Sequence, residues 1–374
     1  MIKIAAVGDL MPGGILSGVN KGWVSPTILS ILNESDIRVG TLETAVGNEP
    51  SFYKEKMDRL ADVIYVKDED LLKIQQLKID ILSLANNHFF DLGPKGACHT
   101  IELLDQKGIK HIGAGRNIEE ASKPYVKIID GKKVTFLAFC DWRNETVGWC
   151  PFATHNNPGV NPMYDNYVVD EIKKYKKQSD YVVVMPHWGQ EHTWVTTNHV
   201  YSMSRIMVNA GADLILGSHP HRVQPIVNFN SASVAYSMGN FLFPDRLIIK
   251  PRSTYYPDMC IDLSTLPVTE AYPYVEELTY KKWKPLARIG MIVFSVIEDK
   301  RISSKYKLTH EQEDGFITLY EDKWIKSRLF FRGIILRFCP YNYFLLIERY
   351  FLAFLRKIKT IYKLFLNTTK LNNI

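Results

Sequence analysis

Residues 211–225 read GADLILGSHPHRVQP, a short apolar run that ends in a pair of histidines. The run Leu214–Leu216 is bounded by turn-forming residues, which is typical of a buried β-strand. His219 and His221 follow just after it. In α/β proteins, ligand-binding residues lie beyond the carboxyl ends of the strands. The stretch therefore predicts a strand whose end carries two histidines into a binding site.

Four other apolar segments show the same arrangement, with a polar residue where each strand is expected to end. The segments are Ile2–Val7, Arg38–Leu42, Ile79–Leu84 and Tyr181–Met185, and the residues that follow them are Asp9, Glu43, Asn87 with His88, and His187. Taken singly, such residues are more typical of turns, helix caps or hydrogen-bonded core positions. Five such segments favour one common site, because independent caps and turns are not expected to collect this set of ligands.

Helical and extended segments alternate through the front of the chain. Helices are expected from Ser25-Pro26 onward and at Glu69–Lys78, Pro94–Gln106, Tyr164–Gln178 and His199–Asn209, with further strands at Val134–Phe139 and Val234–Tyr236. This alternation predicts an α/β fold with a largely parallel sheet and helices packed on it.

The pattern changes near Pro244. Residues from there to 286 are rich in Pro, Tyr and charge without sustained periodicity, and Gly290–Ile297 with Arg301–Leu308 then has the pattern of a hairpin. We therefore divide the chain into a domain over 1–245, an excursion and closing hairpin over 246–322 packed on that domain, and a basic helical tail over 323–374.

The residue types at the strand ends narrow the choice of metal. Imidazoles combined with carboxylates and an amide oxygen suit Mn, Fe, Zn or Co better than Ca or Mg. No cysteine stands near them, which argues against a cysteine-bound structural zinc. Two ions about 3.5–4 Å apart, bridged by a carboxylate, would hold both oxygens of an in-line phosphoryl displacement and lower the pKa of a water.

Neighbouring polar residues suit supporting roles in such a site. His88 follows Asn87 directly and so faces another direction, which favours a proton donor to the leaving group over a metal ligand. Asp91 or Glu191 is expected to orient an imidazole as a hydrogen-bond acceptor.

Three further residues follow the last strands. Arg222 and Gln224 suit either an anionic substrate group, for which Arg offers two parallel hydrogen bonds, or a solvent-facing loop. Asn240, in the segment Gly239-Asn240-Phe241, is expected to be a structural hydrogen-bonding residue that shapes the site from behind.

Six motifs in order along residues 1–245 resemble the CapA-type poly-gamma-glutamate capsule-synthesis family, a relative of the calcineurin-like metallophosphatases. They are AAVGDLM, GTLET, SLANNHFFDLG, VVMPHWGQEH, GADLILGSHPHRVQP and SMGNFLF. The match covers about two-thirds of the chain. The resemblance implies a metallophosphatase-like sandwich of two β-sheets flanked by helices, here with a C-terminal helical extension.

The metallophosphatase pattern carries over residue by residue. Asp9 matches the first aspartate, Glu43 stands in place of the bridging aspartate, Asn87 and His88 match the Asn-His pair of ligand and general acid, His187 matches the single later histidine, and His219 and His221 match the Gly-x-His-x-His ending. One residue departs from it, because Met11 stands where the phosphatases have a histidine. The group of Asp9, Glu43 and His221 is then one ligand short, so the resemblance implies one firmly held divalent metal (Mn, Fe or Zn) and a second that is weak or absent.

Charge is distributed unevenly along the chain. From Lys323 to the end there are 11 Lys and Arg against one acidic residue, Glu348. The chain's net charge of +6, less this +10, leaves −4 for residues 1–322. The segment Tyr341–Leu366 has apolar residues at helical spacing and basic residues opposite. It predicts an interfacial helix on an anionic membrane, although helices packed on the domain with solvated charges outside also fit. An acidic body without a basic groove argues against nucleic acid as a partner.

The expected location is the cytoplasm, peripheral at the inner face of the membrane. The five cysteines show no paired spacing, which is typical of reduced thiols. The first residues run directly into a strand pattern, with no basic and apolar leader. Secreted, N-terminally anchored relatives differ from this arrangement.

Two functions of different class follow. The first is a metal-dependent hydrolase or transferase in capsule or other envelope-polymer synthesis, acting on a phosphate ester, a polyglutamate amide or a lipid-linked saccharide. The second is a non-catalytic assembly factor that recruits the envelope-polymer synthesis machinery to the membrane. The Asn87-His88 pair favours the enzyme, and Met11 favours the assembly factor.

Overall fold

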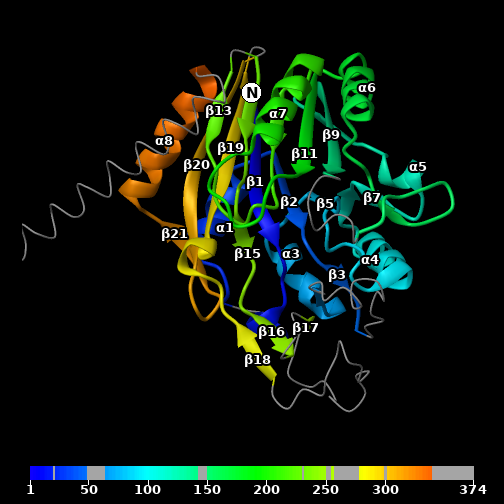
Figure 1. The fold of residues 1–374 in the computed structure, drawn as a ribbon, viewed down its shortest axis with the longest axis vertical. Coiled ribbons are helices and arrows are strands. Elements are labelled where there is room, and N and C mark those ends of the chain that lie inside the picture. The colour runs from blue at the N-terminus through cyan, green and yellow to red at the C-terminus, as the bar shows by residue number, and fades with distance from the viewer. Residues whose placement is uncertain are drawn as a thin grey trace, which may run out of the picture.

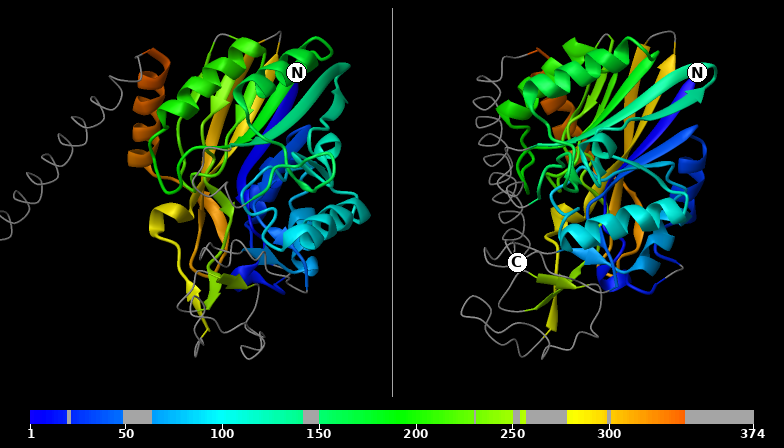
Figure 2. Two further views of the ribbon diagram at one scale, coloured as in Figure 1. Left: turned by 45° about the vertical axis from the view of Figure 1, so that its right-hand side comes forward. Right: turned by 90° about the vertical axis from the view of Figure 1, so that its right-hand side faces the viewer.

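The computed structural model describes residues 1–19, 22–48, 64–141, 150–229, 231–249, 254–256, 278–298 and 301–338. Two β-sheets stand face to face, with helices on their outer sides (Figures 1 and 2). This confirms the α/β sandwich flanked by helices that the sequence predicts.

The first sheet is centred on β1 (Ile2–Leu10). Parallel to it run β2 (Ile37–Leu42), β5 (Ile81–Ser83), β6 (Lys110–Ile112) and β15 (Asn240–Leu242). On its other side β19 (Ile289–Glu298), β20 (Arg301–Glu311) and β21 (Ile317–Tyr320) continue the sheet with antiparallel pairing. The sequence IKIAAVGDL suits the central position, because strands buried on both faces are nearly continuous apolar runs.

The second sheet has the order β13-β14-β12-β11-β9-β8. Its strands are β8 (Tyr125–Ile129), β9 (Lys132–Cys140), β11 (Tyr181–His187), β12 (Leu214–Leu216), β13 (Ile226–Asn228) and β14 (Ser233–Ala235). The four central strands are parallel, and β8 and β13 pair antiparallel at the edges. The expectation of a largely parallel sheet therefore holds for the centres of the sheets only, because hairpin connections add antiparallel strands.

The main hydrophobic core lies between the two sheets, and its buried residues include Val7 and Val39 of the first sheet and Val183 and Leu216 of the second. Helices α1 (Pro26–Asn33), α3 (Leu72–Gln76) and α4 (Gly93–Gln106) also contribute buried residues to it. A second cluster lies under α6 (Asp165–Lys176) and α7 (Asn198–Ala210), which cover the outer face of the second sheet.

Local signals explain where the helices begin and end. Pro26 opens α1 after Ser25. The side chain of Thr197 accepts a hydrogen bond from the N–H of Val200 at the start of α7, and Gly211 ends that helix in the left-handed conformation at φ 114°. A short helix, α5 (Ile118–Ala121), precedes β8.

Residues after 245 contain more regular structure than their composition predicts. β16 (Arg246–Ile249), β17 (Thr254–Tyr256) and β18 (Leu278–Lys281) form a small antiparallel sheet beyond the end of β15 (Figure 1). The predicted hairpin is β19 and β20, and it is a full part of the first sheet, since Ile2–Val7 pair with Ile292–Ile297.

The basic tail begins with α8 (Lys323–Phe338), which packs beside β13 at the side of the molecule away from α4 (Figures 1 and 2). The interfacial helix predicted at 341–366 lies outside the described residues. Within the described part of the chain, no helix is both long and apolar enough to cross a membrane.

Candidate metal centre

The five predicted segments bring their polar residues together between the two sheets. Asp9 is near the end of β1, Glu43 directly follows β2, and Asn87 and His88 lie in the turns after β5. The second sheet supplies His187, the last residue of β11, and the turn after β12 with its two histidines. An isolated bridge between His187 and Ser218 extends the pairing within the second sheet, and a hydrogen bond of 3.3 Å from Thr41 Oγ1 to Ser218 Oγ joins the two sheets at this point.

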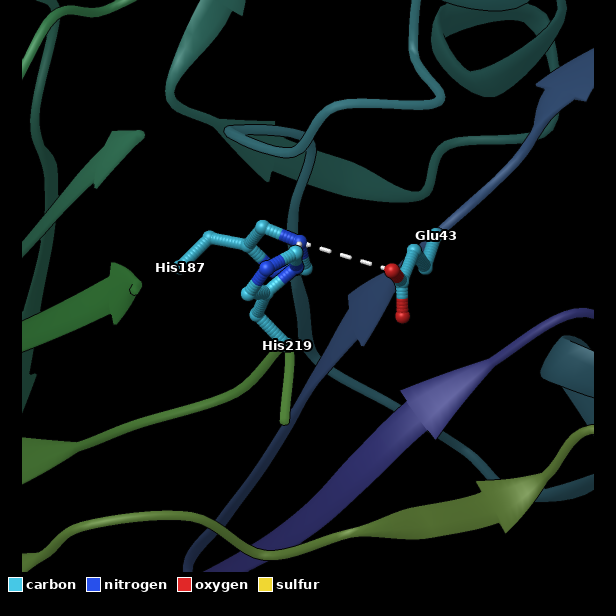
Figure 3. A group of neighbouring side chains, drawn as sticks. All are labelled: Glu43, His187 and His219. Carbon is cyan, nitrogen blue, oxygen red and sulfur yellow. Dashed lines mark hydrogen bonds and ion pairs between the residues drawn. The ribbon is translucent and has the colours of Figure 1, made fainter. Parts of the chain in front are cut away.

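Three other potential ligand atoms lie around Nε2 of His187. Asn87 Oδ1 lies 2.7 Å from it, His219 Nδ1 3.0 Å and Glu43 Oε1 3.4 Å. Figure 3 shows the imidazoles of His187 and His219 close together with the Glu43 carboxylate facing them, and the two ring planes are inclined by 62°. A proton on Nε2 satisfies one hydrogen bond at a time, whereas a cation is attracted to all four atoms, so the arrangement fits a bound metal ion.

The protonation of the two imidazoles also fits metal binding. Burial lowers the pKa of His187 to about 3, although the nearby charge of Asp141 acts in the opposite direction. Burial, with the neighbouring His187, lowers the pKa of His219 well below its usual value. Both rings are therefore neutral at physiological pH and have a lone pair to offer, as metal ligation requires.

A second group of donors shares the same glutamate. Ligand atoms of Asp9, Glu43 and His221 all lie within 4.8 Å of one another, as do those of Glu43, His187 and His219. Both carboxylates are fully buried, and this burial and the Glu43 charge raise the pKa of Asp9 well above its usual value. Two buried carboxylates side by side are unfavourable alone and favourable around a cation. Glu43 thus stands where a bridging ligand belongs.

His221 is oriented by Asn240. Its Nδ1 lies 2.8 Å from the amide Oδ1 of Asn240, whose Nδ2 donates to the carbonyl of Ala287 at 3.1 Å. An amide oxygen is only an acceptor, so Nδ1 carries the proton and Nε2 keeps its lone pair. That Nε2 lies 3.6 Å from Glu43 Oε1. Asn240 therefore holds the tautomer that ligation needs.

The second group lacks a donor at the position of Met11. This side chain is buried, with 1% of its surface exposed, and belongs to the main hydrophobic core. A thioether is a poor ligand for the metals that carboxylates and imidazoles prefer. The second group therefore offers fewer suitable donors than the first.

His88 and Asp91 form a pair beside the first group. The Nδ1 of His88 donates to Asp91 Oδ2 at 2.7 Å, and the same oxygen accepts the backbone N–H of Ile64 at 2.6 Å. The backbone N–H of His88 donates to Asn86 Oδ1 at 2.9 Å. Asp91 is fully buried, whereas His88 keeps 7% of its surface exposed. This geometry leaves Nε2 of His88 as the atom available for proton transfer.

The other predicted supporting residues lie around the turn after β12. Arg222 is buried and its Nη1 donates to the carbonyl of His221 at 2.7 Å, while burial lowers its pKa. Gln224 holds the loop before α7, because Nε2 donates to Thr193 O at 3.0 Å. The carboxylate of Glu191 lies 3.9 Å from Nε2 of the exposed His192. Both Arg222 and Gln224 are buried, so the expected alternative of a solvent-facing loop is wrong for them.

The structure adds Asp141, which the sequence reasoning missed. Asp141 follows β9, is 1% exposed, and its Oδ2 lies 3.0 Å from Nε2 of His199 at the start of α7. Its backbone N–H donates to the carbonyl of His187 at 2.9 Å. The signal was available, since Asp141 is one more polar residue directly after a predicted strand.

Aromatic residues near His221 were also missed. The ring of Trp283 lies 5.4 Å from the rings of both His221 and Phe243, and the ring of His192 lies 5.7 Å from that of His221. Trp283 comes from a segment without periodicity, so no sequence pattern places it at the site.

The chain is weakly similar to solved structures of other proteins. A calcineurin-like phosphoesterase YfkN from Bacillus subtilis is 14% identical, with a TM-score of 0.42, over 82% of this chain and 90% of that one.

Similarity to characterised sequences is closer. The PGA biosynthesis protein CapA of Bacillus subtilis (strain 168) is 30% identical over 65% of this chain and 63% of its own length. The capsule biosynthesis protein CapA of Bacillus anthracis is 30% identical over 65% of this chain and 60% of its own length. The match therefore spans less than two-thirds of either relative.

The family model described as "Bacterial capsule synthesis protein PGA_cap" matches residues 3–245, the span that holds all six motifs and every predicted metal ligand. The chain therefore belongs to this bacterial capsule synthesis family.

Proposed function

We propose that this protein is a metal-dependent hydrolase or transferase in the synthesis of a capsule-type envelope polymer, and that it works at the cytoplasmic face of a membrane. The observation that carries the proposal is the convergence of Glu43, Asn87, His187 and His219, with the His88–Asp91 pair beside them. Its relatives' names supply the polymer class, since both are capsule or PGA biosynthesis proteins.

The donor set divides the work between binding and proton transfer. Glu43, Asn87, His187 and His219 would hold a divalent ion, and Asp9 and His221 would offer a weaker second position. When bound, such an ion supplies Lewis acidity toward a phosphoryl or carbonyl oxygen and lowers the pKa of a water. His88 holds a proton that Asp91 helps to position, and delivers it from Nε2 to the leaving group.

Activity toward model substrates will show which bond is attacked. A phosphate ester, the amide of polyglutamate and a lipid-linked saccharide intermediate all have a leaving group that needs a proton. The cytoplasmic placement is supported by the five cysteines of the sequence, whose spacing is not that of a disulfide framework.

The test compares His88→Ala with the unaltered protein in metal content and in activity toward model phosphate esters and glutamyl amides. A positioned proton donor contributes about 100- to 10,000-fold, so activity is expected to fall by at least about 100-fold while the metal stays bound. His155→Ala is the matched control, because His155 is 84% exposed and pairs with Glu119. Full activity in His88→Ala would remove the proton donor from the account.

A non-catalytic assembly factor is the second candidate, and Met11 is the observation that favours it. In that case His88→Ala would still support polymer production in a cell that depends on this protein, whereas removal of residues 323–374 would stop it. Loss of polymer in His88→Ala, with the protein present at normal level, decides for the enzyme.

A further inference from the structure

Helix α8 is apolar on both of its faces. Ile325, Leu329 and Leu336 are buried, and the first two belong to the core between the sheets. A second set of large apolar side chains on the same helix is exposed, namely Trp324, Phe330, Phe331, Ile334 and Phe338. A surface helix normally presents charged or polar residues on its outer face. The exposed face of α8 departs from this pattern, because it carries large apolar side chains.

The exposed residues form a stripe. Trp324, Phe331 and Phe338 are seven residues apart, which is close to two helical turns, so they lie on one side of α8. Their exposed fractions are 50%, 49% and 70%. Phe330 and Ile334, at 63% and 41%, widen the stripe away from the buried side. Aromatic side chains of this kind favour the boundary between lipid headgroups and acyl chains.

Both α8 and the sequence that follows it are strongly basic. Residues 323–338 contain five Lys and Arg and no acidic residue, and residues 339–374 add six Lys and Arg with one Glu. The guanidinium of Arg337 lies 5.2 Å from the ring centre of Phe338, and that of Arg328 lies 5.1 Å from Trp324. Cations beside exposed aromatic rings complement an anionic lipid surface, where each contributes attraction.

A groove runs along the same helix. It has a volume of about 400 Å³ and lies between α8 and strands β13 and β20. Its apolar lining includes Phe330, Ile334 and Phe338, and Lys305 and Arg337 also line it. A lining of this composition suits a lipid, with an acyl chain against the apolar residues and a phosphate against the cations.

We propose that the exposed stripe of α8 and the groove beside it form a docking surface for a membrane that contains anionic lipid. The stripe enters the headgroup boundary, and the groove takes one lipid of that surface. The candidate metal centre takes no part in this contact, so metal binding and lipid binding can fail separately, while the membrane placement in the proposed function depends on this surface.

Docking through α8 also fixes where the candidate metal centre lies relative to the membrane. Arg332 is 3% exposed and its Nη1 donates to the carbonyl of Trp194 at 2.7 Å, and Arg328 lies 5.3 Å from the Trp194 ring centre. Trp194 belongs to the loop that carries His192, whose ring lies beside that of His221. The helix is thus fastened to a loop at the site.

The test is co-sedimentation of the full chain with vesicles of phosphatidylcholine alone or mixed with phosphatidylglycerol. Binding is expected to be at least about tenfold tighter to the anionic vesicles and to weaken with added salt. The triple variant Trp324→Ser, Phe331→Ser, Phe338→Ser and the double variant Lys305→Glu, Arg337→Glu are each expected to lose at least about tenfold in affinity. Ile128→Ser is the matched control, because Ile128 is 72% exposed on β8.

Thermal melting and light scattering accompany the binding assay. The triple and double variants are expected to melt like the unaltered protein, to remain in its oligomeric state and to lose lipid binding. The double variant His187→Ala, His219→Ala is expected to keep its lipid binding. Unchanged binding in the triple variant would assign lipid affinity to residues beyond α8 and overturn the proposal. A dimer of the unaltered chain that the triple variant breaks would mean that a second copy covers the stripe, which also overturns it.

Discussion

Pro220 separates two histidines that both have a positive φ, 94° at His219 and 50° at His221. Such backbone conformations cost about 1–3 kcal/mol each outside glycine, and they gather at functional sites. The turn is held in place by hydrogen bonds from the N–H of His219 to Asp9 Oδ2 at 3.3 Å and from the N–H of His192 to the carbonyl of Pro220 at 2.8 Å. These hydrogen bonds hold the strained backbone in a conformation that directs the rings of His219 and His221 into the site.

The two groups of potential ligands differ in their number of suitable donors because of Met11. Met11→His is expected to raise the bound metal from about one equivalent to about two, because it restores an imidazole where only a thioether stands. Met11→Leu, which keeps the core apolar, is expected to leave the metal content unchanged. Metal content by mass spectrometry measures both, with a melting curve to show that each variant folds. A folded Met11→His protein that still binds one equivalent would contradict the assignment of this position.

Sequence reasoning worked well for single residues that end a strand. Asp9, Glu43, Asn87, His187, His219 and His221 were predicted to converge, and the structure brings them together. Trp283 and Asn240 show which features of the site the sequence does not predict. The role of Asn240 toward His221 depends on a hydrogen bond of 2.8 Å between segments, and no local pattern encodes which polar group meets which ring.

At the scale of elements, the pairing of β1 with β19 means that the domain needs residues beyond 245 in order to fold. Six residues of each strand are in register, from Ile2 opposite Ile297 to Val7 opposite Ile292. Most residues of both strands are buried along this pairing. The span matched by the family model ends at residue 245, before β19 begins.

A chain shortened to residues 1–245 is therefore expected not to fold cooperatively, because the central strand loses its antiparallel neighbour. Circular dichroism with thermal melting checks this, and a chain of residues 1–338 serves as the control that keeps the whole sheet. A stable, cooperative melt from the 1–245 chain would show that the hairpin is dispensable to the domain.

The pairing of β19 was beyond reach of the sequence for a physical reason. The sequence predicts the hairpin of Gly290–Ile297 and Arg301–Leu308 from its alternating pattern and its turn, which are local properties. Their partner in the sheet lies almost the whole chain away, and the same apolar pattern suits many neighbours. Local patterns likewise predict α4 and α7, but they do not reveal the small sheet of β16, β17 and β18.

At the scale of the whole molecule, buried acidic groups tie stability to pH. Glu311 is fully buried, and this burial raises its pKa well above the usual value of 4.5, although Arg288 acts in the opposite direction. A carboxyl whose folded pKa is raised stabilises the fold below its unfolded pKa. That stability is lost as the pH rises through the folded value.

Glu311→Gln keeps an acceptor for the N–H of Phe243, which donates to Glu311 Oε1 at 3.1 Å, and cannot ionise. Its melting temperature relative to the unaltered protein is therefore expected to rise as the pH increases from about 5 to about 9. Glu313→Gln is the control, since Glu313 is 80% exposed. Parallel curves for Glu311→Gln and the unaltered protein would contradict the assignment.

The arrangement of the molecule gives its two proposed activities separate places. The candidate metal centre lies between the sheets, and the proposed docking stripe lies on α8, with the loop of His192 and Trp194 between them. The charge division at residue 323 was visible in the sequence, but the buried and exposed faces of α8 became clear only from its packing on β13.

Metal content of protein purified without chelator tests the central claim most directly, measured by mass spectrometry beside the double variant His187→Ala, His219→Ala and the control His155→Ala. The account predicts about one equivalent of Mn, Fe or Zn in the unaltered protein and in His155→Ala, and none in the double variant. Absence of metal from the unaltered protein even after reconstitution, or equal metal in the double variant, would contradict it.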